Sequence, residues 1–168
     1  MGRDKARITT DGVSLLKQMI QKGERHFDNV VLLSGDNTYD VPNRQLQDWF
    51  SDAGPLGGIL AALEDCERAG MTQCCIVPVD LPAIFDSTLK LLADTDLRED
   101  EDARVLTSSE GIQPLAGVYS AVCNDRLQDY LKTGNRMVFG FLNRLNYSTI
   151  TVSNSELKNV NTPDDLEN

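Results

Sequence analysis

Four short segments of the sequence combine residue types that bind phosphates or metals with turn residues that would expose them. The first is Gly2-Arg3-Asp4-Lys5, which precedes any expected secondary structure. A lysine beside a glycine could present a compact positive charge on a long stem to a phosphate group. Alone the signal is weak, because most lysines near an N-terminus are simply solvated.

The second segment is Asp52-Ala53-Gly54-Pro55-Leu56-Gly57-Gly58. Three glycines and a proline at the start of a helix let the backbone approach a ligand and direct free N–H groups at it. Gly54, Pro55, Leu56 and Gly57 are therefore candidate nucleotide contacts, although a turn with tight helix packing explains them equally well. Asp48, six residues before Gly54, could accept hydrogen bonds from a base or ribose.

The third segment, Val77-Pro78-Val79-Asp80-Leu81-Pro82, is an apolar strand that ends in one aspartate between two prolines. Mg²⁺ binds one or two protein carboxylates and leaves its other positions to water and substrate phosphates. Asp80 is thus a candidate metal ligand, and a turn or helix-capping aspartate is the alternative.

The fourth segment is Asn159-Val160-Asn161-Thr162-Pro163-Asp164-Asp165. Its second half is typical of a helix start, with Thr162 as the N-cap and Pro163 as the first helical residue. Asn159 and Asn161 occupy alternate positions of an extended segment, so they share one side and could donate amide contacts to a ligand.

Short apolar runs alternate along the chain with stretches of helical spacing. The spacing predicts strands at Val30–Leu33, Cys74–Val79, Arg104–Thr107, Leu115–Tyr119 and Thr149–Val152, and helical stripes at Val13–Ile20, Leu56–Cys66, Leu89–Ala93 and Leu127–Leu131. This alternation indicates an α/β fold of three layers, with a mostly parallel sheet covered by helices on both faces. Ligands bind such sheets outside the carboxyl ends of the strands.

The composition restricts the partners. The 168 residues suit one domain, and a formal net charge of −10 argues against non-specific binding to nucleic acid or to an anionic membrane. No run approaches the length of a membrane span and no secretory signal is visible, so we expect a cytoplasmic protein. The four cysteines lack CxxC spacing and are expected to be reduced, packed thiols. The acidic stretch Asp94–Asp102 is expected to be a solvated loop.

Taken together, six segments resemble the molybdenum cofactor guanylyltransferase family (molybdopterin-guanine dinucleotide synthases). They are Met1–Ala6, Gly54–Leu63, Val77–Pro82, Pro114–Ser120, Gly134–Val138 and Asn159–Leu166, in the family's order along essentially the whole chain. The resemblance implies a Rossmann-like nucleotidyltransferase fold. It also implies Mg²⁺-dependent transfer of GMP from GTP to molybdopterin, with release of pyrophosphate.

The resemblance also implies roles for single residues. Lys5 matches the phosphate-binding lysine, Asp48 the aspartate on the guanosine side and Asp80 the magnesium aspartate. Asn159 and Asn161 match asparagines on the molybdopterin side, and Ser34 stands where many members have an asparagine. Partners implied by the family are GTP, molybdopterin and other molybdenum-cofactor or molybdoenzyme proteins.

The family's first strand and its glycine-rich loop precede the segment that matches Met1. We therefore expect residues 1–168 to be a single nucleotidyltransferase domain shortened at its N-terminus, with weak GTP binding and low turnover. Two alternatives remain open. One is a cytidylyltransferase, or another nucleotidyltransferase of the same fold; the other is a catalytically inactive molybdopterin-binding module.

Overall fold

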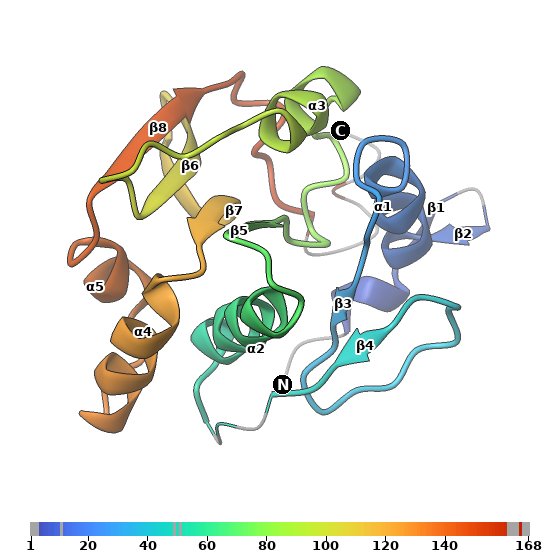
Figure 1. The fold of residues 1–168 in the computed structure, drawn as a ribbon. Coiled ribbons are helices and arrows are strands. Elements are labelled where there is room, and N and C mark those ends of the chain that lie inside the picture. The colour runs from blue at the N-terminus through green and yellow to red at the C-terminus, as the bar shows by residue number, and fades with distance from the viewer. Residues whose placement is uncertain (1–3, 11, 49, 51, 161–164, 166–168) are drawn as a thin grey trace.

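The computed structural model describes residues 4–10, 12–48, 50, 52–160 and 165. Its elements follow one another as shown in Figure 1. In chain order they are η1 (Lys5–Arg7, a 3₁₀ helix), β1 (Thr9–Thr10), β2 (Val13–Ser14), α1 (Leu15–Gly23), β3 (Leu32–Leu33), β4 (Gln45–Leu46), α2 (Pro55–Arg68), β5 (Gln73–Ile76), α3 (Asp86–Ala93), β6 (Ala103–Ser108), β7 (Gly111–Ser120), α4 (Cys123–Lys132), α5 (Val138–Leu142) and β8 (Tyr147–Thr151).

A four-stranded sheet with the order β5-β7-β6-β8 forms the larger part of the molecule. Strand β7 is antiparallel to both β5 and β6, whereas β6 and β8 are parallel. Three of these strands therefore run in one direction. The strands expected at Arg104–Thr107 and Leu115–Tyr119 are the two arms of one hairpin, in which Ser108 pairs with Gly111. The short connection leaves no room for the helix that a parallel crossover would need.

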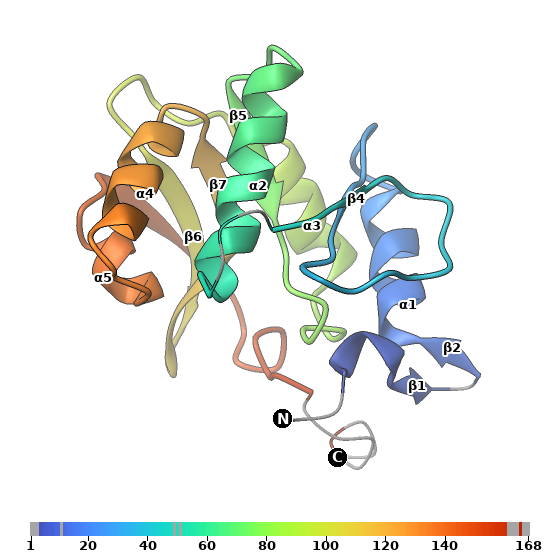
Figure 2. The ribbon, with the colours of Figure 1, turned by 90° about the horizontal axis from the view of Figure 1, so that it is seen from below.

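Helices cover both faces of this sheet, so the expected three layers are present (Figures 1 and 2). On one face, α2, α4 and α5 bury a core that includes Leu60, Tyr119 and Phe141. On the other face, α3 packs through Leu89 and Leu92. Cys74 contacts the first core and Cys75 the second, as the alternation of side chains along a strand requires. All four cysteines are free thiols.

A smaller unit consists of η1, α1 and the two parallel strands β3 and β4, and it lies beside α2 (Figure 2). Within the described residues, β3–β4 and the four-stranded sheet are separate sheets. Within the described residues, β3 pairs with β4 and not with β5. The apolar strands β3 and β5 therefore each have one unpaired edge.

The helix boundaries follow local sequence signals. Helix α2 begins at Pro55, the favoured first position, and Gly70 follows it with φ of 70°, a conformation that suits glycine. Strand β5 ends at Ile76, earlier than expected, so Asp80 lies on a turn beyond the strand. Helix α5 and strand β4 are not predicted from the sequence. No helix in the described part of the chain is long and apolar enough to cross a membrane.

Gly117, in a segment that resembles the family, is required by strand packing. A Cβ atom there would lie 2.7 Å from Cα of Val105 on the neighbouring strand. The register of β6 against β7 shifts just after Val105, between Val105 and Leu106. Such irregularities are common where two backbones approach closely. This glycine is therefore needed for the close packing of β7 against β6.

The acidic stretch Asp94–Asp102 is not wholly solvated, which corrects the expectation from its charge. Glu101 and Asp102 are buried, with 3% and 7% of their surfaces exposed. Glu101 accepts hydrogen bonds from Arg104 at 2.5 Å and from the hydroxyl of Ser148. Hydrogen bonding to Arg104 is the main cause that lowers the pKa of Glu101 to about 2. The last acids of the stretch therefore anchor β6 to β8.

Replacing Glu101 tests this anchor. Because its pKa is lower in the folded than in the unfolded state, its contribution to stability is complete above the ordinary glutamate pKa and is lost as the pH falls towards 2. We expect Glu101→Gln to lower the free energy of unfolding at pH 7 by about 3 kcal/mol. The deficit relative to the wild type should shrink by about half between pH 5 and pH 3. Urea unfolding at each pH measures both values, with the exposed Glu99→Gln as a matched control. A deficit that is independent of pH would show that charge is not the cause.

Candidate functional site

A groove of about 610 Å³ lies between β3 and β5, with α1, α2 and α3 along its walls. Most of its lining is apolar. Its polar end, defined here by Lys5, Gly35, Asp48, Gly54 and Pro55, lies beyond the carboxyl ends of β3 and β5. This is the edge at which the sequence predicts chemistry, and it brings together residues from three of the four candidate segments.

Lys5 and Asp80, predicted separately, form an ion pair across the site. Nζ of Lys5 lies 2.8 Å from Oδ2 of Asp80. Asp4 caps the 3₁₀ helix that carries Lys5, because its side chain accepts a hydrogen bond from the N–H of Ala6. The side chain of Lys5 is 38% exposed and that of Asp80 is 17% exposed, so both remain within reach of a ligand.

The turn that carries Asp80 is held by distant parts of the chain. The N–H of Val160 donates to the carbonyl oxygen of Asp80 at 2.9 Å. Lys22 of α1 donates to the carbonyl oxygens of Pro82 and Ile84 at 2.6 and 2.8 Å. Burial lowers the pKa of Lys22. These contacts hold the backbone of the turn from which the Asp80 side chain projects.

Asp48 lies against the first turn of α2. A Cβ atom at Gly57 would lie 2.8 Å from Oδ2 of Asp48, so only glycine leaves room for the carboxylate there. Oδ1 is buried and has no hydrogen-bond partner among the described residues. Burial, and secondarily the charge of Asp36, raise the pKa of Asp48. An unpartnered buried oxygen is costly unless a ligand donates to it.

The start of α2 supplies backbone donors beside Asp48. Gly54 has φ of 58° and ψ of −143°, a conformation that is essentially restricted to glycine. It is the N-cap residue, and no side chain of the described residues caps the helix. The helix N-terminus therefore presents N–H groups and a partial positive charge to an anion. The helix start therefore has a defined turn conformation, formed by Gly54, Pro55, Leu56 and Gly57. This agrees with both the ligand-binding and the packing interpretation.

The fourth candidate segment lies only partly within the described residues. Asn159 is exposed and precedes Val160, which packs against Ile8 and Leu15 and donates to Asp80. Asn161 lies outside the described residues. Ser34 is buried and its hydroxyl donates to the carbonyl oxygen of Leu46, so its role in the structure is to fasten β3 to β4.

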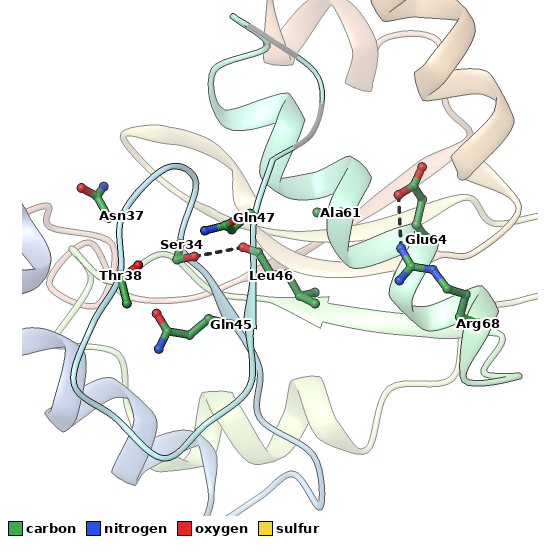
Figure 3. A pocket seen from close by; sticks show the side chains of 9 residues that line it. All are labelled: Ser34, Asn37, Thr38, Gln45, Leu46, Gln47, Ala61, Glu64 and Arg68. Carbon is green, nitrogen blue, oxygen red and sulfur yellow. Dashed lines mark hydrogen bonds and ion pairs between the residues drawn. The ribbon is translucent and has the colours of Figure 1, made fainter.

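A second pocket, of about 390 Å³, lies between the β3–β4 region and α2 (Figure 3). Figure 3 shows amide side chains of the β3–β4 region on one wall and the ion pair of Glu64 with Arg68, from α2, on the other. Neither Lys5, Asp48 nor Asp80 lines it. The polar end of the groove is therefore the better candidate for the chemistry.

Two contributors to the site are missing from the sequence prediction. Tyr39 donates its hydroxyl hydrogen to Asp4, with an O–O distance of 3.1 Å to Oδ2, and so steadies the segment that carries Lys5. Gly35, with φ of 54°, turns the chain after β3 and lies close to the carboxylate of Asp48. The dipeptide Gly35-Asp36 directly after an apolar run is a turn signal that could have located this second loop.

The oxygen atoms that the site offers as metal ligands suit a hard divalent ion that takes most of its ligands from a bound substrate. Among the described residues, no group of three or more His, Cys, Asp or Glu side chains could hold a metal alone. Asp80 offers one carboxylate, which matches the sparse protein coordination of Mg²⁺ beside phosphates. The thiols nearby suit no such role, because burial raises the pKa of Cys75 to about 12.

The raised pKa of Asp48 leads to a stability prediction. The folded chain favours the protonated form, so the ionised carboxylate costs stability at neutral pH and the cost disappears as the pH falls. We expect Asp48→Asn to raise the midpoint of urea unfolding at pH 7, and the gain to shrink towards pH 4. Asp36→Asn should raise the midpoint by a smaller amount, and the substitution Asp40→Asn, at an exposed position, should leave it unchanged. A lowered midpoint for Asp48→Asn would mean that the carboxylate stabilises the fold.

Comparison with known proteins agrees with this geometry. The sequence model of the MobA-like NTP transferase domain matches residues 1–146. A probable molybdenum cofactor guanylyltransferase of Rhodopirellula baltica is 34% identical over 116 residues, which are 67% of this chain and 54% of that protein. One from Pelotomaculum thermopropionicum is 29% identical over 180 residues, covering 99% of this chain and 83% of the relative.

The fold is shared with solved structures. Molybdopterin-guanine dinucleotide biosynthesis protein A from Archaeoglobus fulgidus superposes with a TM-score of 0.78 and 23% identity, covering 99% of this chain and 88% of that one. This match confirms the predicted α/β nucleotidyltransferase fold. Together with the family match over most of the sequence, it confirms the resemblance that the motifs carry: this chain belongs to the MobA-like NTP transferase family.

Proposed function

We propose that this chain transfers GMP from GTP to the terminal phosphate of molybdopterin and releases pyrophosphate. One observation carries the proposal. The polar end of the groove joins a lysine–aspartate ion pair, a helix N-terminus and a buried carboxylate oxygen. Among the described residues, no side chain caps that helix and no group donates a hydrogen bond to that oxygen. A nucleoside triphosphate has the complementary groups, namely a polyanionic chain at one end and a base with N–H donors at the other. The names of the relatives support the choice of GTP and molybdopterin.

The reaction needs positioning more than covalent chemistry. An oxygen of the pterin's terminal phosphate attacks the α-phosphorus of GTP, and a new P–O bond forms. The bond from the α-phosphorus to the bridging oxygen breaks, and its electron pair leaves with pyrophosphate. Holding both reactants in line lowers the barrier by removing their translational and rotational freedom. The fixed turn of Asp80 and the rigid start of α2 supply that positioning.

Lys5 and Asp80 act on the triphosphate. Lys5 donates hydrogen bonds from a position fixed by the capped 3₁₀ helix, and its charge offsets that of the phosphates. Asp80 would hold Mg²⁺, which when bound neutralises charge on the phosphates and on the leaving pyrophosphate. The oxygen of Asp80 that Lys5 contacts is Oδ2, and Oδ1 is the other candidate ligand atom.

Asp48 is the proposed contact to the base. A carboxylate can accept hydrogen bonds from both the N1–H and the amino group of guanine, and cytosine does not offer this pair of donors. The buried Oδ1 of Asp48 has no hydrogen-bond partner among the described residues, and the absence of a side chain at Gly57 lets the carboxylate lie close to the helix. Asn159 and Asn161 are proposed to meet the pterin side, because the Asn159–Val160 segment joins the Asp80 turn.

Removing the proposed metal ligand should reduce turnover. We expect Asp80→Asn to lower the rate of pyrophosphate release by about two orders of magnitude or more, because charge in the transition state is no longer neutralised. A coupled pyrophosphate assay with GTP and molybdopterin measures the rate over a titration of Mg²⁺. Asp86→Asn is the matched control, since Asp86 pairs with Arg25 on the surface, and it should keep the wild-type rate.

The shape of the Mg²⁺ titration separates a metal ligand from a structural residue. Asp80→Asn should need more Mg²⁺ for half-maximal rate, whereas a folding defect would lower the rate equally at every concentration. A wild-type rate with an unchanged Mg²⁺ dependence would refute the role of Asp80.

Base preference is a separate prediction. Unlabelled GTP should displace bound labelled GTP at lower concentrations than CTP does. In the Asp48→Asn variant, the displacing concentrations of GTP and CTP should lie closer together. The physical reason is that the amide of asparagine offers one acceptor where the carboxylate offers two. Equal displacement by GTP and CTP from the wild-type chain would refute guanine selection and favour a cytidylyltransferase.

A further inference from the structure

The carboxylate of Glu156 bridges two segments that lie far apart in the sequence. Glu156 is buried, with 4% of its surface exposed. Its Oε2 accepts hydrogen bonds from the N–H of Phe85 at 3.1 Å and from the hydroxyl of Thr88 at 2.5 Å. Its Oε1 accepts from the N–H and the hydroxyl of Ser153 at 3.3 and 3.2 Å. One oxygen therefore binds the start of α3, and the other closes a turn in its own segment.

Glu156 provides α3 with the cap that its own N-cap residue lacks. That residue is Phe85, whose side chain makes no capping hydrogen bond. A carboxylate at a helix N-terminus satisfies a free N–H group and interacts favourably with the positive end of the helix dipole. The chain that follows β8, red in Figure 1, is therefore joined to the start of α3 by this contact.

The segment capped in this way continues directly from the Asp80 turn. Lys22 donates to the carbonyl oxygens of Pro82 and Ile84, just before Phe85. Ile84 itself is buried, with 1% of its surface exposed. The backbone between the turn and α3 is therefore held from two sides, by an ammonium group on its carbonyls and by a carboxylate on an N–H.

The two segments meet a second time at Asp80, whose carbonyl oxygen accepts from the N–H of Val160 at 2.9 Å. Residues 80–85 and 156–160 therefore run in opposite directions and are joined at both ends. Asn159 lies inside the joined stretch, one residue before Val160, and is exposed. Both joints consequently limit where the side chain of Asn159 can stand.

We infer that Glu156 is a positioning residue for the acceptor substrate. It sets the place of Asn159 beside the Asp80 turn, and thereby the affinity for molybdopterin, without acting on GTP. The inference rests on the proposed function, in which Asn159 meets the pterin and Asp80 meets the triphosphate. It adds a residue whose only contact with the site is through the backbone that it holds.

Loss of Glu156 affects the two substrates unequally. The Asp80 turn would keep its bonds to Lys22 and its ion pair with Lys5. Asn159 would keep only the joint at Val160. The side proposed to bind the triphosphate therefore stays in place, whereas the side proposed to bind the pterin loosens.

Glu156→Ala tests the inference through binding and not through turnover. Equilibrium dialysis measures the dissociation constants of molybdopterin and of labelled GTP separately. We expect the constant for molybdopterin to rise about tenfold, the effect of losing about one hydrogen bond, and that for GTP to change by less than about twofold. Hydrogen exchange at the Val160 amide, followed by NMR, should become about tenfold faster, because its bond to Asp80 opens more often once the other joint is lost.

Two further variants separate positioning from stability. Glu101→Gln is the matched control, because it removes a buried carboxylate near the amino-terminal ends of β6 and β8, at the opposite edge of the sheet. It should lower stability and leave both dissociation constants unchanged. Glu156→Gln is the conservative variant. Its amide oxygen can still accept from Phe85 and Thr88, but its amide nitrogen cannot accept from Ser153, so we expect an intermediate effect.

The outcomes are distinct. An equal rise in both dissociation constants, or a rise for molybdopterin in Glu101→Gln as large as in Glu156→Ala, would make Glu156 a merely structural residue and overturn the inference. Unchanged exchange at Val160 would overturn it as well. A wild-type chain that binds molybdopterin but releases no pyrophosphate would contradict the proposed transfer, and weaker binding of molybdopterin by Glu156→Ala would then still support the inference. A wild-type chain that does not bind molybdopterin would overturn both.

Discussion

The ion pair between Lys5 and Asp80 is the contact on which the arrangement of the site depends. It joins the smaller unit, which contains η1, α1 and β3–β4, to the turn beyond the four-stranded sheet. The turn is also fastened by Lys22 and by the backbone of Val160. A lysine and an aspartate that stabilise each other in this way keep a cation and a carboxylate side by side in a partly buried place. That combination suits a ligand made of phosphates and a divalent ion.

Much of the site is predictable because each candidate carries a local signal. Lys5, Asp80 and the glycines at Gly54 and Gly57 stand next to turn or helix-start residues, and the structure places them at the ends of the strands. Asp48 has no such signal of its own. Its significance comes from the contact with Gly57 and from an oxygen that the fold buries without a partner. Both depend on how a loop packs against a helix.

The helices and strands divide in the same way, into those that carry a local sequence signal and those that do not. The helices at Leu15–Gly23 and Pro55–Arg68 are predictable from their apolar spacing and from the glycines at or just beyond their ends. Cys74 and Cys75 lie on opposite faces of the sheet, as the alternation of side chains along a strand requires. The direction of β7 is not predictable in this way, because an apolar run has the same composition in either direction. The burial of Glu101 escaped prediction for a related reason, since its partner Arg104 follows the acidic stretch and only the strand geometry brings Ser148 to it.

The fastening of the Asp80 turn has a consequence for how the protein acquires its activity. The residues that meet there are 75 positions apart for Lys5 and Asp80, and the backbone bond to Val160 comes from near the other end of the chain. Contacts between residues so distant in sequence form late, because closing long loops costs chain entropy before any contact repays it. During synthesis the segment around Val160 emerges after nearly all of the sheet. A growing chain can therefore have most of its core in place while the corner proposed to bind phosphates is still open, and the candidate site is complete only when Val160 meets the Asp80 turn.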